Sequence, residues 1–116
     1  MTLPRENRLL HTNEIKEVFE KGKRKRGRFL SIYCLPREDG EYKIAVIVRK
    51  RKRAIERNRL RRLIKEAYRL LLPRFSKGHH IVVLPLTGAV DNLLNAKMQD
   101  IKEEMEKILK RSGVLR

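Results

Sequence analysis

The sequence has few of the residues that build disulfide frameworks, metal clusters or membrane spans. Cys34 is the only cysteine, which excludes an intramolecular disulfide and a thiolate zinc cluster. No apolar run approaches the roughly twenty residues of a membrane-spanning helix, and no apolar signal segment follows the N-terminus. We therefore expect a cytoplasmic protein. Cys34 lies in an apolar run, which favours a small buried hydrophobe over a nucleophile.

Residues that commonly perform catalysis are also scarce and scattered. His79 and His80 are adjacent, so on a strand they would point to opposite faces, and we interpret both as surface or loop residues. Glu38, Asp39 and Glu41 fall in a turn, and the remaining clustered acids occupy the polar side of a C-terminal helix. There is no glycine-rich phosphate loop, no H-E-x-x-H and no nucleophile elbow. We expect no catalytic residue and no metal site in the protein itself.

Aromatic residues are few: the chain has three phenylalanines, three tyrosines and no tryptophan. A surface that stacks several bases is therefore not expected. Phe19 in the first expected helix and Tyr33 in the first expected strand could still meet across helix and sheet. Such a wall would stack a single-stranded nucleotide for roughly 1–3 kcal/mol per base. The alternative is a core contact with a hydroxyl at its edge.

Negative charge is the most pronounced deficit. Fourteen Asp and Glu residues stand against 30 Lys and Arg, giving a formal net charge of +16 and a pI near 10.7. Self-repulsion of this size works against a compact monomer and indicates a nucleic-acid partner, with an anionic membrane as the weaker option. At 116 residues we expect one domain, with residues 1–11 as an extended arm.

The cations are concentrated in residues 49–69, with nine in the fourteen positions 49–62. From Ala54 onward, a rotation of about 100° per residue separates an apolar stripe from a basic face. The stripe comprises Leu60, Leu63, Ile64, Ala67 and Leu71. The basic face comprises Asn58, Arg61, Arg62, Lys65 and Arg69. Like charges four residues apart cost a few tenths of a kcal/mol per pair, so a bound polyanion explains the face better than a solvated charge run does.

A second basic cluster, residues 21–28, surrounds two glycines, and we predict a mobile loop that either contacts RNA or is a solvated tether. The remaining pattern predicts a helix from Thr12 or Asn13 to Gly22, strands at 29–35, 42–48 and 80–84, and helices at 54–72 and from 91 or 92 to 110. The nearly continuous apolar character of 42–48 indicates a central strand. The order predicts an α+β sandwich on a small sheet.

The stretch from Ala54 to Tyr68, AIERNRLRRLIKEAY, resembles the signature of the bacterial ribonuclease P protein subunit: an Arg-Asn-Arg core, two further basic residues and an apolar-basic helix. Further matches in order extend the resemblance over about residues 5–110: Asn7-Arg8-Leu9, Val18-Phe19 before Gly22, Tyr33 and His80-Ile-Val-Val. The sequence departs from the family at Lys52 and Arg53, where a glycine and a small or polar residue are usual, and at Ile15 and Leu30, where aromatics are common.

The resemblance implies a single-domain fold of the ribosomal-protein-S5-domain-2-like type, a small central sheet with the Arg-Asn-Arg helix in a left-handed crossover. It also implies the protein cofactor of a ribonucleoprotein endoribonuclease, whose RNA subunit removes the 5′ leader of precursor tRNA with Mg²⁺ held mainly by the RNA and the substrate. The implied partners are ribonuclease P RNA and precursor tRNA, with no membrane and no obligate protein partner.

Two groups of residues are predicted to carry this function. The RNA-binding group comprises Arg49, Lys50, Arg53, Arg57, Asn58, Arg59, Arg61, Arg62 and Lys65. Phe19 and Tyr33 would line a cleft for the leader between the first helix and the sheet. We expect Arg57, Arg59 and Arg62 mainly to secure assembly, and the aromatic pair mainly to distinguish precursor from mature tRNA, which lacks the leader.

Two other functions remain open. A structural RNA-binding protein, such as a ribosomal component, would share the fold and the charge but would not promote cleavage. A metal-dependent nuclease acting alone is opposed by the absence of a convincing acidic or histidine cluster in the sequence.

Overall fold

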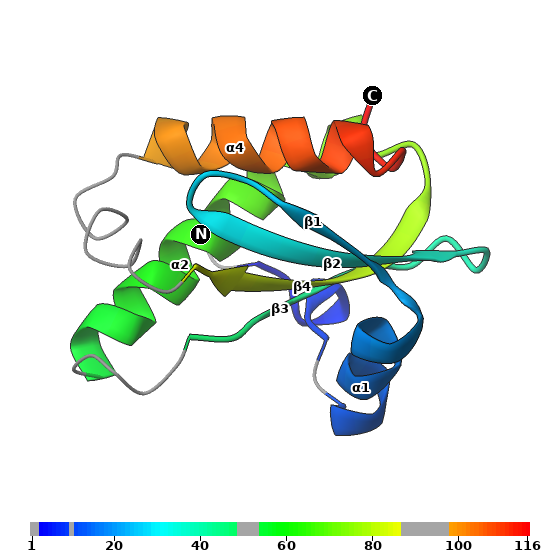
Figure 1. The fold of residues 1–116 in the computed structure, drawn as a ribbon, viewed down its shortest axis with the longest axis horizontal. Coiled ribbons are helices and arrows are strands. Elements are labelled where there is room, and N and C mark those ends of the chain that lie inside the picture. Colours follow the sequence, from blue (N-terminus) through cyan, green and yellow to red (C-terminus); the bar gives the residue numbers. More distant parts are fainter. Residues whose placement is uncertain (1–2, 10, 49–53, 87–97) are drawn as a thin grey trace.

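The structure, a computed structural model, describes residues 3–9, 11–48, 54–86 and 98–116 (Figure 1). Three α-helices and four strands account for most of them, and two short 3-10 helices, η1 and η2, complete the order. The elements are η1 (Arg5–Asn7), α1 (Thr12–Lys21), β1 (Lys23–Arg26), β2 (Leu30–Arg37), β3 (Tyr42–Val46), α2 (Ala54–Leu71), η2 (Leu72–Arg74), β4 (Gly78–Pro85) and α4 (Met98–Arg111).

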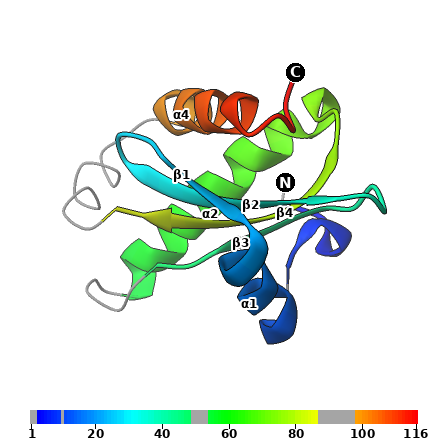
Figure 2. The ribbon, with the colours of Figure 1, turned by 45° about the vertical axis from the view of Figure 1, so that its right-hand side comes forward.

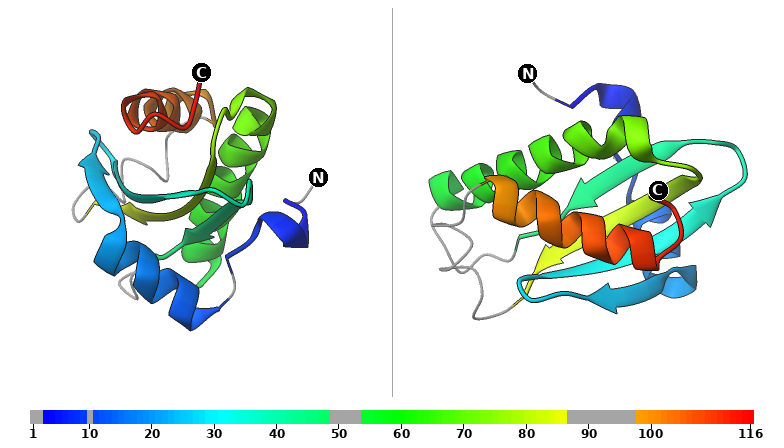
Figure 3. Two further views of the ribbon diagram at one scale, coloured as in Figure 1. Left: turned by 90° about the vertical axis from the view of Figure 1, so that its right-hand side faces the viewer. Right: turned by 90° about the horizontal axis from the view of Figure 1, so that it is seen from above.

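The four strands form one mixed sheet in the order β1-β2-β4-β3. β2 pairs antiparallel with β1 and with β4, whereas β3 and β4 are parallel and are connected through α2. Helices α2 and α4 lie on one face of the sheet and α1 lies on the other, as Figure 2 and both views of Figure 3 show. The predicted α+β class, with its crossover helix between two neighbouring strands, is confirmed.

Two apolar cores hold these layers together. The larger lies between the sheet and the α2–α4 pair, and the smaller lies under α1. Leu60, Ile64, Ala67 and Leu71 of α2 are all fully buried in the larger core, which confirms the predicted apolar stripe. Leu63 packs at its margin, and α2 also buries Tyr68. The basic face of α2 is thereby turned away from the sheet.

Residues 21–28 do not form the predicted loop, because β1 occupies their centre. Lys23 pairs with Cys34 of β2 and Arg26 pairs with Ser31, with the register continuous between them. An apolar pattern cannot reveal such a strand, since β1 is an edge strand and its lysines and arginines remain largely in solvent. Charged side chains on an edge strand also discourage pairing with other chains.

The predicted central position of residues 42–48 is likewise wrong, since β3 is the opposite edge strand and β4 lies inside the sheet. The apolar character of β3 comes from burial on both faces of the sheet, since Ile44 lies in the larger core and Ala45 in the smaller. The N-terminal arm covers the outer edge of β3. Leu9 donates its backbone N–H to the carbonyl of Ile44 at 2.8 Å, and the Asn7 amide donates to the carbonyl of Tyr42 at 2.8 Å. The arm is therefore docked, with a 3-10 turn at its start.

His79 and His80 point to opposite faces of β4 as predicted, but both are buried rather than at the surface. The His79 ring lies among the rings of Tyr42, Tyr68 and Phe75. Burial raises the pKa of Tyr68, so its phenol stays protonated and donates to His79 Nε2 at 2.9 Å. His79 Nδ1–H then donates to the carbonyl of Lys77 at 3.0 Å. This arrangement requires a neutral imidazole.

The buried His79 is expected to make stability depend on pH. Burial lowers its pKa from 6.5 to about 4, so between these values the unfolded chain binds a proton that the folded protein does not. The free energy of unfolding should therefore fall by about 3 kcal/mol as the pH is lowered from 6.5 to 4. Above pH 6.5 the contribution of the neutral His79 to stability should be fully present. Urea unfolding across this range measures it. His79→Gln should flatten the dependence, and an equally steep curve for this variant would contradict the assignment.

Candidate nucleic-acid interface

The outer face of α2 carries most of the predicted RNA-binding residues that the structure describes. Asn58, Arg59 and Arg62 are exposed, while Arg57, Arg61 and Lys65 are half-buried. Arg61 donates from Nη1 to the Asn58 side-chain oxygen at 3.3 Å, which ties two of the predicted residues together. The predicted residues Arg49, Lys50 and Arg53 lie outside the described residues.

Part of this face borders a hollow of about 430 Å³ between α2 and the N-terminal arm. Asn58, Arg61, Arg62 and Lys65 line it from α2, and Leu3, Arg8 and Glu66 complete the lining. Arg8 is held in place because its Nε and Nη2 both donate to the Leu3 carbonyl, at 3.0 and 2.8 Å. Sequence reasoning did not select Arg8 as a site residue. Its contribution depends on the docking of the arm, which no local pattern reveals.

The positive charges in this hollow are crowded enough to affect one another. Burial lowers the pKa of Lys65, and the neighbouring charges of Arg8 and Arg61 lower it further. The acid in the lining, Glu66, is engaged elsewhere: the Arg69 guanidinium hydrogen-bonds to it and lowers the pKa of its carboxyl group. The carboxylate in the lining therefore does not neutralise the crowded cations of this hollow. A phosphate group, which arginine and lysine side chains bind well, would neutralise them.

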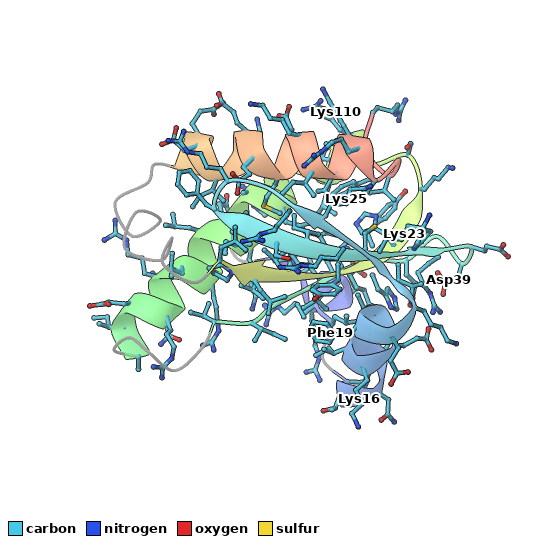
Figure 4. All side chains as sticks on the ribbon, viewed as in Figure 1. Lys16, Phe19, Lys23, Lys25, Asp39 and Lys110 are labelled. Carbon is cyan, nitrogen blue, oxygen red and sulfur yellow. The ribbon has the colours of Figure 1, made fainter. Side chains whose placement is uncertain are left out.

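Phe19 and Tyr33 meet as predicted, on the α1 side of the sheet. Their ring centroids lie 4.8 Å apart with an angle of 72° between the planes, an edge-to-face contact. Phe19, labelled on α1 in Figure 4, is 37% exposed. Because the two rings touch, they form one continuous aromatic surface, on which a base would stack from outside instead of entering between them.

Arg24 of β1 extends this aromatic surface with a cation and was missed by sequence reasoning. Its guanidinium carbon lies 6.0 Å from the centroid of the Tyr33 ring, and its Nε donates to the Ser31 hydroxyl at 2.8 Å. The alternation of residues 23–26 would have placed it beside Tyr33, had the strand been recognised. Leu30, by contrast, is fully buried on the other face of the sheet, so its difference from the usual aromatic does not affect this surface.

Glu14, Glu41 and His80 form a further polar group at the α1 end of the sheet. Glu41 Oε1 lies 3.0 Å from His80 Nε2, and Glu14 Oε2 lies 3.8 Å from His80 Nδ1. In the part of the chain that the structure describes, this is the group whose spacing could hold a metal ion. The two acids lie at the two different nitrogens of one imidazole ring. The arrangement satisfies a buried histidine and does not resemble a catalytic centre.

The family assignment follows from comparison with known sequences. The family model described as Ribonuclease P matches residues 3–113. The chain belongs to the ribonuclease P protein family. The ribonuclease P protein component of a Picosynechococcus strain is 40% identical over 104 residues, covering 88% of this chain and 90% of that protein. The corresponding protein of Clostridioides difficile is 31% identical over 116 residues, covering 98% of both chains.

Solved structures with the same fold bear the same family name. The RNase P protein of Staphylococcus aureus superposes with a TM-score of 0.80 at 20% identity, covering 95% of this chain and 98% of that one. The Thermotoga maritima protein gives 0.81 at 22% identity, covering 90% and 96%. The resemblance drawn from Ala54 to Tyr68 is thus confirmed. Ribonuclease P proteins serve a ribonucleoprotein that processes tRNA, and membership implies association with ribonuclease P RNA.

The helices in the described ranges include none that is both long enough and apolar enough to span a membrane.

Proposed function

We propose that this protein is the cofactor of a catalytic RNA that removes the 5′ leader of precursor tRNA by magnesium-dependent endonucleolytic cleavage. It would act in the cytoplasm without an obligate protein partner. The observation that carries the proposal is the hollow beside α2, where Arg61, Arg62 and Lys65 gather with Arg8 and the lining acid Glu66 is paired with Arg69. A surface of this kind is suited to bind phosphate groups, and membership of the family indicates that the phosphates belong to ribonuclease P RNA.

The outer face of α2 would hold the catalytic RNA. Arg59, Arg61 and Arg62 are there in excess over nearby acids, and their planar guanidinium groups can each donate two parallel hydrogen bonds to one phosphate. Binding would neutralise phosphates where the large RNA and its substrate approach each other. Less magnesium would then be needed to hold the two RNAs together.

The α1 side of the sheet would hold the leader. A base stacked on the exposed face of Phe19 or Tyr33 would bring its phosphate within reach of Arg24, whose guanidinium already lies over the Tyr33 ring. Mature tRNA lacks the leader and cannot make these contacts. Affinity would therefore be higher for precursor than for product, which favours product release.

We propose that the magnesium ions are held mainly by the RNA subunit and the substrate. Magnesium prefers an octahedral set of oxygen ligands. Among the described residues, the group whose spacing could hold a metal ion, Glu14–Glu41–His80, includes a histidine nitrogen and so departs from an all-oxygen set. The chemistry of phosphodiester hydrolysis is therefore assigned to the RNA, and the protein supplies charge and leader contacts.

Cleavage of a 5′-labelled precursor tRNA by a bacterial ribonuclease P RNA tests the proposal, at a magnesium concentration that is too low for the RNA alone. We expect addition of the protein to restore cleavage at the mature 5′ end, with no cutting by the protein alone. Binding of the RNA without rescue would contradict the proposal and favour a structural RNA-binding protein. Cutting by the protein alone would favour the metal-dependent nuclease.

A further inference from the structure

The basic strand β1 presents two different faces, of which the function proposed above uses only one. Arg24 lies on the α1 side, beside Tyr33. Lys23 and Lys25 alternate with it, so they project to the other side, toward α4. Figure 4 places their labels between the sheet and the last turns of α4, whereas Phe19 lies on α1 below the sheet. The lysine face of β1 is thus separate from the aromatic surface.

These lysines open onto a hollow of about 240 Å³. Its lining is drawn from the end of α1, from β1, from β2 and from the end of α4: Lys21, Lys23, Lys25, Cys34, Pro36, Arg111 and Ser112. Four cations from three elements therefore surround one small space. Within the described ranges, none of the four forms an ion pair with a carboxylate, so their charges are not neutralised by the protein.

Two ordinary explanations account for parts of this cluster but not for its convergence. Lys21 and Arg111 occupy the last turns of α1 and α4, where cations favourably oppose the helix dipole. Lysines on an edge strand prevent pairing with other chains. Neither effect requires the side chains to face one hollow. Arg111 moreover fixes β1 to α4, because its Nη2 donates to the carbonyl of Arg26 at 3.2 Å.

This hollow and the α2 surface lie at opposite edges of the molecule. β1 is one edge of the sheet and β3, beside which α2 packs, is the other. The left view of Figure 3 shows β1 and α2 toward opposite sides of the molecule. An RNA segment held along the outer face of α2 would therefore leave the lysine hollow free for another.

We propose that the hollow formed by Lys21, Lys23, Lys25 and Arg111 binds a phosphate of an RNA backbone, as a second contact separate from α2 and from the aromatic surface. The inference rests on the proposed function, since it takes ribonuclease P RNA or its substrate as the source of the phosphate. The protein would then bridge two RNA segments. Of the cations that give the net charge of +16, those at two edges of the fold would then contact RNA, and not those of α2 alone.

A membrane surface fits this hollow less well than RNA does. Peripheral binding to lipid combines cations with apolar side chains that enter the acyl boundary. The exposed large apolar residues of the described chain are Phe19, Ile55 and Leu70, which belong to α1 and α2 and do not line the hollow. A concave group of cations whose lining contains no large exposed apolar side chain matches a phosphate of a nucleic-acid backbone.

The test compares Lys23→Gln/Lys25→Gln with a matched control, Lys102→Gln/Lys107→Gln on α4, which removes the same charge outside the hollow. Binding of labelled ribonuclease P RNA is measured by fluorescence anisotropy over a range of KCl concentrations. Each phosphate contact contributes about 0.7–0.9 to the slope of log affinity against log salt. We expect the slope to fall by about 0.8 for the hollow variant, which loses this one phosphate contact, and to be unchanged for the control. Equal slopes for the two variants would overturn the proposal.

Three further measurements keep the outcome unambiguous. Should the double variant fail to fold, Lys21→Gln, at an exposed helix end, tests the same hollow, with an expected fall in slope of at most about 0.8. When Lys23→Gln/Lys25→Gln is combined with Arg61→Ala/Arg62→Ala, the two losses in log affinity should add, because separate contacts are independent. Non-additive losses would contradict bridging. Vesicles containing phosphatidylglycerol should bind both lysine variants equally. A selective loss of vesicle binding, with RNA binding intact, would overturn the proposal in favour of lipid.

Failure of this inference differs from failure of the proposed function. If the wild-type protein binds ribonuclease P RNA no better than a mixed-sequence RNA hairpin, the proposed function fails. If wild-type binding is specific and the hollow variant behaves like its control, only the second contact fails.

Discussion

Replacing Arg59, Arg61 and Arg62 by Ala is expected to weaken binding of ribonuclease P RNA by about a thousandfold. A hydrogen bond between charged partners contributes about 1.5–3 kcal/mol, so three lost guanidinium contacts cost at least about 4 kcal/mol, and 1.4 kcal/mol corresponds to a factor of ten. The slope of log affinity against log salt should fall by about 2–3. Anisotropy titrations at several salt concentrations measure both quantities.

The folded state should not suffer from this triple change. None of the three side chains is buried in the core, since Arg59 and Arg62 are exposed and Arg61 is half-buried. Arg57, Arg61 and Lys65 are like charges spaced four residues apart, which repel one another. We therefore expect unchanged or slightly raised stability in urea. Lys77→Ala/Lys102→Ala/Lys107→Ala removes equal charge elsewhere and should lower affinity only slightly. Equal losses for the two triple variants would show that net charge, and not the α2 surface, binds the RNA.

Replacing both Phe19 and Tyr33 by Ala is expected to lower the affinity of the assembled ribonucleoprotein for precursor tRNA by about ten- to a hundredfold. The reason is loss of one or two stacked bases, each worth roughly 1–3 kcal/mol. Affinity for mature tRNA should not change, because the product has no leader to stack. The measurement is the ratio of the two dissociation constants, determined with the same preparation.

Two controls separate stacking from folding in this experiment. The edge-to-face pair itself contributes about 0.5–1.5 kcal/mol, so the double variant should unfold at lower urea but remain folded in buffer. Tyr33→Phe keeps the ring and should retain the wild-type ratio of precursor to mature affinity within about twofold. If the double variant lost affinity for precursor and mature tRNA equally, this result would exclude a role of the surface in leader recognition.

The main elements of the fold could be predicted because each has an apolar period of its own. The stripe of α2 from Leu60 to Leu71 fixes both the helix and its buried face. Gly113, with φ of 81°, ends the C-terminal helix region as its sequence position indicates. β1 could not be predicted, since Lys23–Arg26 has no apolar residue and becomes a strand only through its pairing with β2.

Tertiary contacts also explain why several polar residues that were expected at the surface have buried or long-range partners. His79 and His80 are polar in sequence, yet partners far along the chain, Tyr68 and Glu41, make their burial favourable. Glu104 was expected in solvent on the last helix. Its carboxylate instead accepts hydrogen bonds from the backbone N–H groups of Arg28, Phe29 and Leu30 at 2.7–3.0 Å. No local periodicity encodes a carboxylate that caps the turn of a distant hairpin.

The residues of the candidate site likewise include some that could be predicted from the sequence and some that could not. The cations of α2 could be found from sequence because a helix repeats them on one face, and the meeting of Phe19 with Tyr33 followed from strand alternation. Arg8 and Arg24 could not be found, because one depends on the docked arm and the other on an unrecognised strand. Residues that join a site through long-range packing need the structure.

The most direct test of leader recognition is the affinity for precursor tRNAs with leaders of increasing length, measured for ribonuclease P RNA with and without this protein. With the protein, we expect affinity to rise by about tenfold or more over the first leader nucleotides that reach Phe19 and Tyr33, and then to level off. The RNA alone should show no such rise. The same dependence on leader length with and without the protein would contradict the account.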